Sequence, residues 1–330
     1  MDEPQNWREL LGRVISDPLE RHRIATTLGV NAITLSRWAS NSSTPRSENI
    51  RHLIEVLPQQ QHPGFVDLIA DEFPEFSAEA IIMDEGGLEI PSSFYACILS
   101  THADTSDALY YWSMCKLILQ QMLEQLDPRR LGMMIMVAQC TPPVGQNKVR
   151  SLRGNMRLGT FPVRNTLEQE AMFLGAETLC GSVASSCRPL TLQSLDEENG
   201  LHDHIMVDAA SITAYPILRK GRIAGCILIT STCGNYFTSN RLALIQNYTN
   251  LLALAFQPEE FYDPKDIQLG IMPAVTAQKP YFATFRQRIA DVMRMSLNNR
   301  RPINIADAEQ LVWQQLEEDL LHLNSHVVSG

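Results

Sequence analysis

Arginine side chains gather in one short stretch of the chain. Residues 19–57 contain five arginines and three acidic residues, whereas the whole chain of 330 residues carries 27 basic and 37 acidic side chains and a formal net charge of −10. A guanidinium group binds phosphate oxygens, and it also holds O6 and N7 of a guanine through two hydrogen bonds. The local reversal of charge therefore predicts a nucleic-acid-binding surface here and not over the whole molecule. The arginines are Arg21, Arg23, Arg37, Arg46 and Arg51.

The following segment has the opposite charge. Residues 58–103 contain eight acidic side chains and neither Lys nor Arg. Because phosphate repels such a segment, we expect residues 59–103 to form an acidic helical linker that stays off a duplex.

Cysteines and histidines are the second set of residues whose side chains could react or bind a ligand. Four cysteines form two pairs, each separated by six residues, and the motif LHDHI contains two histidines. Thiolates can hold an iron–sulfur cluster or form a redox disulfide, and histidines can ligate haem or iron. The chain has no CxxC pair, and cysteines in apolar strands are ordinarily small buried hydrophobic residues. We predict no metal site. The candidates for ligand or redox chemistry are Cys180, Cys187, Cys226, Cys233, His202 and His204.

Two short helices around a glycine are predicted to carry the arginines. The first, residues 20–28, has apolar Ile24 and Ala25 on one side, and Gly29 supplies a turn that requires positive φ. Asn31 is a good N-cap for the second helix, in which Leu35 and Trp38 face inward. This arrangement is typical of a helix-turn-helix, with the second helix in the major groove.

The same residues resemble a known family. IATTLGVNAITLSRW followed by TPRSENIRHLIEVL is similar to the helix-turn-helix of the Cro and lambda-repressor type, the xenobiotic-response-element (XRE) family, over residues 6–58. The chain departs from the family pattern at Ala39, Ser40 and Asn41, where relatives have an acidic residue and a glycine. Asn41 also tolerates the left-handed conformation.

The resemblance implies a set of DNA contacts. It places Ala32, Ile33 and Arg37 over base edges, Thr34 and Ser36 near phosphates, and Arg21 on a phosphate. The expected DNA-binding residues within residues 1–58 are Arg21, Asn31, Ala32, Ile33, Thr34, Ser36, Arg37, Asn41 and Arg46.

Heptad spacing marks two longer helices. Apolar or small residues recur at intervals of four and three from Ala108 to Leu126, and a second such pattern runs from Leu242 to Phe256. Such a spacing suits pairing with a second copy, although the same stripes can pack on the domain's own sheet. The expected dimer contacts are Trp112, Cys115, Leu119, Met122, Leu126, Leu242, Ile245 and Leu252.

Strands are predicted between these helices. Residues 131–140, 149–154 and 188–192 each favour a strand, and residues 211–231 favour a hairpin that turns at Lys220 and Gly221. This order predicts an α/β domain around an antiparallel sheet.

A second resemblance covers residues 104–257. LCGSVASSCRPLTLQSL, SITAYPILRKGRIAGCILITS and FTSNRLALIQNYTNLLALAF are similar, in the right order, to stretches of the GAF domain, a relative of PAS that binds small molecules. The resemblance implies a ligand near residues 158–206. Asn147 and Lys148 begin a motif like that of cyclic-nucleotide binders, but the acidic pair after Phe161 is missing. The ligand and any cofactor therefore remain open.

Composition bounds the remaining features. With 45% hydrophobic residues the chain can bury a core, and it contains neither an apolar run long enough for a membrane span nor a signal peptide, so we expect a cytoplasmic protein. The tail, residues 258–330, predicts a helix over 281–297 and another capped by Asp307 with Gln310 in a capping box. RNA polymerase is one candidate contact for these C-terminal helices.

The predicted fold class is α+β multidomain, with an all-α N-terminal helix-turn-helix domain, a GAF/PAS-like α/β domain and C-terminal helices. The predicted function is a homodimeric transcription regulator, not an enzyme, that binds a pseudo-palindromic operator in double-stranded DNA and senses a small molecule or a redox signal. Two alternatives are a GAF-type thiol-dependent reductase and a protein-interaction adaptor that does not bind DNA.

Overall fold

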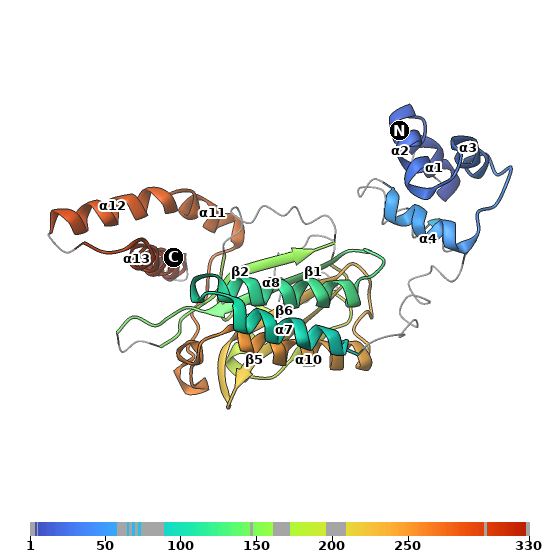
Figure 1. Ribbon diagram of the computed structural model, residues 1–330. Helices are drawn as coiled ribbons and strands as arrows, with labels where there is room; N and C mark the ends of the chain where they lie inside the picture. Colours follow the sequence, from blue (N-terminus) through green and yellow to red (C-terminus); the bar gives the residue numbers. More distant parts are fainter. Residues whose placement is uncertain are drawn as a thin grey trace.

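The computed structural model describes residues 4, 6–57, 65, 68, 69, 72, 73, 89–145, 148–160, 172–195, 209–299 and 302–327. In these parts a six-stranded antiparallel sheet is flanked by helices, and further helices precede and follow it in the chain (Figure 1). The expectation of an antiparallel sheet between two helical regions is confirmed.

Four short helices form the N-terminal helical unit. Asn6, Asp17 and Asn31 cap the first three helices, each through a side-chain oxygen that accepts a backbone N–H of the first turn. The expected turn is present, because Gly29 has φ of +65° and ends the second helix. The helices are α1 (Trp7–Val14), α2 (Pro18–Leu28), α3 (Ala32–Ala39) and α4 (Ser47–Val56).

The core of this unit extends beyond the four helices. Phe65 and Ile69 are fully buried against it, and Phe73 lies edge-to-face with Trp7. Glu72 accepts a hydrogen bond from the indole N–H of Trp7 and pairs with Arg8. Apolar residues of the acidic segment thus join the core of the unit beyond the predicted boundary at residue 58.

One sheet organises the middle of the chain, in the strand order β3-β2-β1-β6-β5-β4. The predicted hairpin is present, and Lys220 and Gly221 both have positive φ at its turn. The strands are β1 (Met133–Cys140), β2 (Leu152–Gly159), β3 (Met172–Leu174), β4 (Leu190–Leu192), β5 (Ser211–Arg219) and β6 (Arg222–Ser231).

Helices cover both faces of the sheet. Two helices pack directly on one face, toward which alternate residues of β1 such as Ile135 and Val137 point, and a third helix, which precedes them in the chain, packs outside them. A short helix packs on the opposite face with Met134 and Met136. The first three are α7 (Ser92–Asp104), α8 (Asp107–Leu126) and α10 (Ser239–Leu252), and the short one is α9 (Leu179–Ser186).

Two strands differ from expectation. The second strand begins at Leu152 and runs to Gly159, later than the predicted 149–154, and its register shifts at a bulge opposite Val137 and Ala138. Only Leu152 and Met156 of this strand are buried, so it lacks the alternation that marks a strand in sequence. The three-residue strand β3 was not predicted.

The chain continues from α10 into three short turns, η3 (Ala253–Ala255), η4 (Pro258–Glu260) and η5 (Pro264–Asp266). The predicted helix 281–297 is instead two helices that meet at Thr284, whose hydroxyl bonds the carbonyl of Tyr281. Asp307 does not cap the last helix, since Asn304 accepts the N–H of Asp307. The helices are α11 (Val275–Ala283), α12 (Phe285–Asn298) and α13 (Ile305–Val327).

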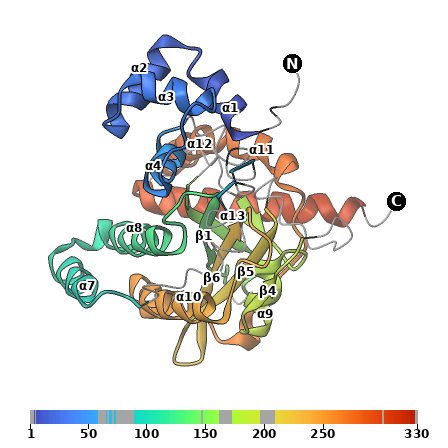
Figure 2. The ribbon, with the colours of Figure 1, turned by 90° about the vertical axis from the view of Figure 1, so that its right-hand side faces the viewer.

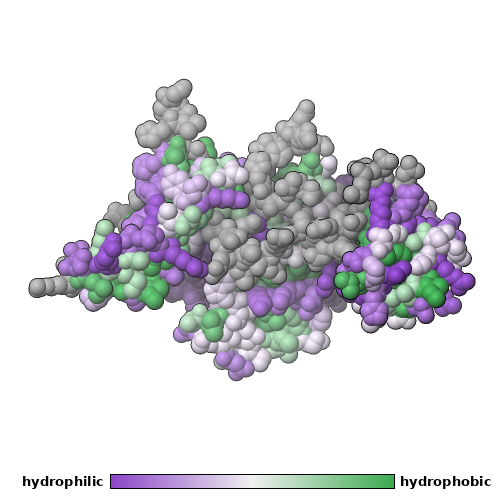
Figure 3. All heavy atoms as spheres, turned by 90° about the horizontal axis from the view of Figure 1, so that it is seen from above, coloured by the Kyte–Doolittle hydropathy of each residue, from purple (hydrophilic) through white to green (hydrophobic). Residues whose placement is uncertain are grey.

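The C-terminal helices share a small core with the edge of the sheet. Phe173 of β3 stacks on Phe282 and meets Trp313 edge-to-face. Val312, Leu316 and other apolar residues of α13 complete this core, and α13 runs past the end of β1 (Figure 2). From above, the described residues of the N-terminal and C-terminal helices mix hydrophilic with hydrophobic side chains (Figure 3).

Candidate functional site

The third helix presents a set of exposed side chains on the N-terminal helical unit. Ile33 is 67% exposed, and Arg37, one turn later, is also exposed. Leu35 and Trp38 are buried beneath them, as expected. The helix contains no acidic residue, so the guanidinium of Arg37 is the only formal charge on it.

The other predicted DNA contacts surround this helix. Asn31 accepts the N–H of Ile33, so its carboxamide oxygen caps the helix. Asn41 has φ of +57°, the left-handed conformation that asparagine was expected to tolerate there. Ala32, Thr34, Ser36 and Arg21 are partly buried, and Arg46 is exposed.

Arg23 has a structural role. Its guanidinium pairs with Glu20 and donates to the carbonyl of Val56, which ties α2 to the end of α4. The hydrogen bond to Glu20 raises the pKa of Arg23. This arginine is therefore already engaged within the unit.

Four cysteines lie together on the face of the sheet that α9 covers. The carbonyl of Cys180 lies 3.9 Å from the thiol of Cys226, and both residues are fully buried. Cys187 ends α9 with φ of +53° and is half-buried. Cys140 joins the group, and burial raises the pKa of Cys140 and, less strongly, of Cys187. We call Cys140, Cys180, Cys187 and Cys226 the thiol group.

Of the other members of the predicted redox set, the structure describes only Cys233. Cys233 packs against the core on the opposite face of the sheet, so the equal spacing of Cys180/Cys187 and Cys226/Cys233 does not bring all four thiols together. His202 and His204 lie outside the described residues. Among described side chains, no group of three or more His, Cys, Asp or Glu could hold a metal ion.

A pocket of about 290 Å³ opens between the ends of β1 and β2, turn η4 and the first half of α13. Arg153 forms one wall, and its guanidinium carbon lies 4.3 Å from the centre of the Trp313 ring. The residues lining this pocket, here called the α13 pocket, are Gln139, Cys140, Thr141, Pro142, Arg153, Glu260, Ala306, Glu309, Gln310, Trp313, Gln314 and Glu317.

A hydrogen-bond chain fixes Arg153. Its Nε donates to Asn155 Oδ1 at 2.7 Å, and the amide of Asn155 donates to the side-chain oxygen of Gln139. Gln139 in turn donates to Glu260 at 2.5 Å. Burial lowers the pKa of Arg153, but a guanidinium stays charged near neutral pH. The positive charge is thus held rigidly at the wall of the pocket.

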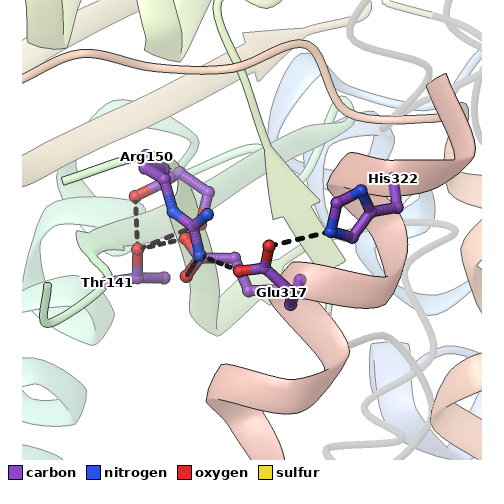
Figure 4. A network of polar contacts seen from close by, with 6 residues as sticks. Thr141, Arg150, Glu317 and His322 are labelled. Atoms are coloured by element: carbon purple, nitrogen blue, oxygen red, sulfur yellow. Dashed lines mark hydrogen bonds and ion pairs between the residues drawn. The ribbon is translucent and has the colours of Figure 1, made fainter. Parts of the chain in front are cut away.

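A buried carboxylate attaches α13 beside this pocket (Figure 4). Glu317 is 3% exposed and accepts hydrogen bonds from Thr141 at 2.8 Å and Ser151 at 2.5 Å. Arg150 lies 3.6 Å from the second oxygen of Glu317 and pairs with Glu318 at 2.5 Å. His322 contacts Glu318 one turn further along the helix.

Comparison with known protein families identifies the sheet and its covering helices. The model of the GAF domain matches residues 113–256. These residues form a GAF domain. The match includes most of α8 and all six strands, and it ends before η4 and the C-terminal helices. The α13 pocket therefore lies between the GAF domain and a part of the chain outside it.

Solved structures resemble the chain at low similarity. Type II free methionine-R-sulfoxide reductase from Thermoplasma acidophilum is 15% identical with a TM-score of 0.35, and the match covers 47% of this chain and 99% of that one. The GAF domain of the Acinetobacter phosphoenolpyruvate-protein phosphotransferase is 11% identical with a TM-score of 0.36, covering 49% and 89%. The free methionine-R-sulfoxide reductase of Neisseria meningitidis, in complex with its substrate, is 13% identical with a TM-score of 0.31, covering 58% and 89%.

These matches correct one expectation. The prediction that the chain is not an enzyme is contradicted, because the structures that match it include free methionine-R-sulfoxide reductases.

No curated protein has a sequence that matches this chain. None of the helices within the described residues is long and apolar enough to span a bilayer.

The predicted dimer contacts are mostly inside the GAF domain. Cys115, Leu119 and Met122 are fully buried under the sheet, and the same holds for Leu126, Ile245 and Leu252. Their heptad spacing therefore matches packing on the domain's own sheet, and none of these six side chains is exposed. Of the predicted set, Trp112 is 47% exposed and Leu242 is partly buried.

The α13 pocket was missed by sequence reasoning. Thr141 and Glu317 are separated by 176 residues, and Arg153 reaches Trp313 over a similar separation. No spacing rule joins such distant positions. The local signal was the presence of two charged residues, Arg150 and Arg153, inside the strand predicted for residues 149–154.

Proposed function

We propose that this chain is a sequence-specific DNA-binding regulator whose GAF domain senses a small-molecule or redox signal. A sensor role is consistent with the GAF domain. One observation carries the DNA-binding part: Ile33 and Arg37 lie exposed one turn apart on a helix that is capped by Asn31. In this proposal α3 enters the major groove, Arg37 contacts a guanine and Ile33 contacts a thymine methyl.

The charge of the unit supports this orientation. The exposed surface of α3 carries Arg37 without a neighbouring acid on the helix, and Arg46 is exposed in the segment before α4. Glu72, in contrast, is held by Arg8 and Trp7. The carboxylate of Glu72 is thus paired with a cation inside the unit.

The proposed assembly is a homodimer that binds a pseudo-palindromic operator. Its candidate contacts are exposed apolar residues of α7 and α8, because six of the eight predicted contact residues are buried. Leu99 is 67%, Leu109 60% and Trp112 47% exposed. The free energy falls when a second copy covers such large apolar side chains and removes them from water.

The direct test is selection from random genomic duplex fragments with the purified full-length chain, followed by sequencing of the retained DNA. The proposal predicts enrichment of one inverted repeat, with binding that weakens steeply as salt rises. A retained pool with the composition of the input would reject it. A protein-interaction adaptor would show neither enrichment nor salt-dependent binding.

The thiol group favours a second candidate function, thiol-dependent reduction of a small substrate. Cys187 is its half-exposed member, with three buried cysteines beside it. Free methionine sulfoxide, the substrate class named for the reductases above, is the first compound to test, with dithiothreitol as reductant. Turnover that is lost in Cys187→Ser and retained in Cys233→Ser would support this function. Equal rates with and without protein would reject it.

A further inference from the structure

The α13 pocket has the features of a built binding site outside the thiol group and the DNA-binding surface. Its volume of about 290 Å³ lies at the low end for small-molecule sites. Its walls come from the sheet, from the turn η4 and from α13, so a bound molecule would contact all three. A ligand of amino-acid size suits this volume better than a nucleotide.

The guanidinium of Arg153 is oriented to bind an anion. Its Nε is occupied by Asn155, and the face of the group lies against Trp313. Within the described residues, neither Nη group has a hydrogen-bond acceptor. Two parallel N–H groups at the end of a guanidinium match the two oxygens of a carboxylate.

The α13 wall of the pocket carries the complementary charge. Glu309 lines the pocket from the first turns of α13 and is exposed, and its charge acts on Arg153. The other two pocket carboxylates are already engaged, Glu260 by Gln139 and Glu317 by Thr141 and Ser151. The free cation and the free carboxylate of the pocket therefore belong to Arg153 and Glu309, and the side-chain amides of Gln310 and Gln314 lie beside them.

We propose that the α13 pocket binds a free amino acid, with its carboxylate on the Nη groups of Arg153 and its ammonium group toward Glu309. The inference deepens the sensor part of the proposed function by assigning it a site and a ligand class. Such a ligand would add a second link between the end of the sheet and α13, beside the one that Glu317 already makes.

The experiment measures binding of the twenty common L-amino acids to the full-length chain without DNA, by calorimetry and by tryptophan fluorescence. The part of the fluorescence change that is missing in Trp313→Phe is assigned to Trp313. At least one amino acid is expected to bind at concentrations below about 10 mM. Its deaminated carboxylate, its decarboxylated amine and inorganic phosphate are the comparison probes. The amine is expected to bind far more weakly, because it lacks the group that Arg153 holds.

Two variants assign the two ends of the ligand. Arg153→Met is expected to weaken binding at least tenfold, whereas Arg157→Met, on the same strand with its guanidinium near Met172, leaves binding unchanged. Glu309→Gln, at an exposed position that does not threaten folding, should abolish the preference for the amino acid over its deaminated analogue.

Three outcomes overturn the proposal: no amino acid binds, phosphate alone binds, or Glu309→Gln leaves the preference for the ammonium group intact. Because DNA is absent from these measurements, a negative result leaves the DNA-binding proposal untouched. Conversely, failure to select DNA would not alter the binding measured here.

Discussion

The carboxylate of Glu317 on the last helix accepts a hydrogen bond of 2.5 Å from the hydroxyl of Ser151, next to the start of β2. Both side chains are buried, so this contact attaches α13 to the sheet without water between them. Arg150 adds charge to the same carboxylate from 3.6 Å.

Replacing Glu317 with Ala should therefore loosen α13. Thr141 and Ser151 lose their shared acceptor, and hydrogen bonds to a charged group contribute about 1.5 to 3 kcal/mol. We expect the free energy of unfolding to fall by about that amount and protease cleavage within residues 305–327 to accelerate. Glu318→Gln is the control, because its pair with Arg150 is half-exposed and worth about 1 kcal/mol or less. Equal effects of the two substitutions would contradict the assigned role of Glu317.

Substitutions of Leu119 and Trp112 distinguish a residue that packs in the core from one that contacts a second copy. Leu119 is fully buried, so Leu119→Ala should lower the free energy of unfolding by about 2 to 5 kcal/mol and leave the mass of the folded species unchanged. Trp112 is 47% exposed, and Trp112→Ser should weaken self-association with little effect on unfolding. Denaturant titration and light scattering on both variants test this. A monomer produced by Leu119→Ala at full stability would show that the heptad stripe is a dimer contact after all.

Thiol labelling tests the arrangement of the seven cysteines. Cys97 is exposed and should react first at pH 8, followed by half-buried Cys187 and Cys233. Cys115 should remain unlabelled until the protein unfolds, because burial raises its pKa to about 12 and keeps the thiol protonated well above neutral pH. Mass spectrometry of the labelled peptides gives the order. Prompt labelling of Cys115 in folded protein would contradict its placement under the sheet.

Phe65 tests the extent of the N-terminal helical unit. It is fully buried and lies 5.9 Å from the ring of Trp7, centre to centre. Phe65→Ala should destabilise the unit by about 3 to 5 kcal/mol, and Leu19→Ala, at an 81% exposed position, should change stability by less than about 0.5 kcal/mol. Denaturant unfolding with Trp7 and Trp38 fluorescence measures both. If Phe65→Ala were as stable as Leu19→Ala, the unit would end near residue 58 as the sequence suggested.

Local rules predicted the local features of this chain. The turn at Gly29, the cap at Asn31 and the hairpin turn at Lys220 each depend on one residue and its immediate neighbours, and all are present. The sheet and its GAF motifs were predictable because buried strands and their turns have strong patterns. The heptad stripes were ambiguous, since the same spacing serves a partner helix or a sheet, and only the burial of Leu119 decides between them.

The α13 pocket could not be predicted from the sequence, for a different reason. The α13 pocket brings together Gln139, Arg153, Glu260 and Trp313, four positions from separate parts of the chain. Their juxtaposition depends on how the C-terminal helices pack on Phe173 at the edge of the sheet. The thiol group shows the same limit, because Cys140 belongs to it through strand register, whereas Cys233, predicted from spacing, does not.

The most direct test of the account is the affinity of the full-length chain for its selected duplex, measured for the native protein and for Arg37→Ala at several salt concentrations. One bidentate arginine–guanine contact contributes about 1 to 3 kcal/mol of discrimination, so we predict a loss of roughly tenfold or more and relaxed preference at one position per half-site. Arg13→Ala, an exposed arginine on α1, is the matched control and should retain the base preference. An Arg37→Ala protein that binds the same duplex with unchanged affinity and base preference would contradict the claim that α3 reads DNA.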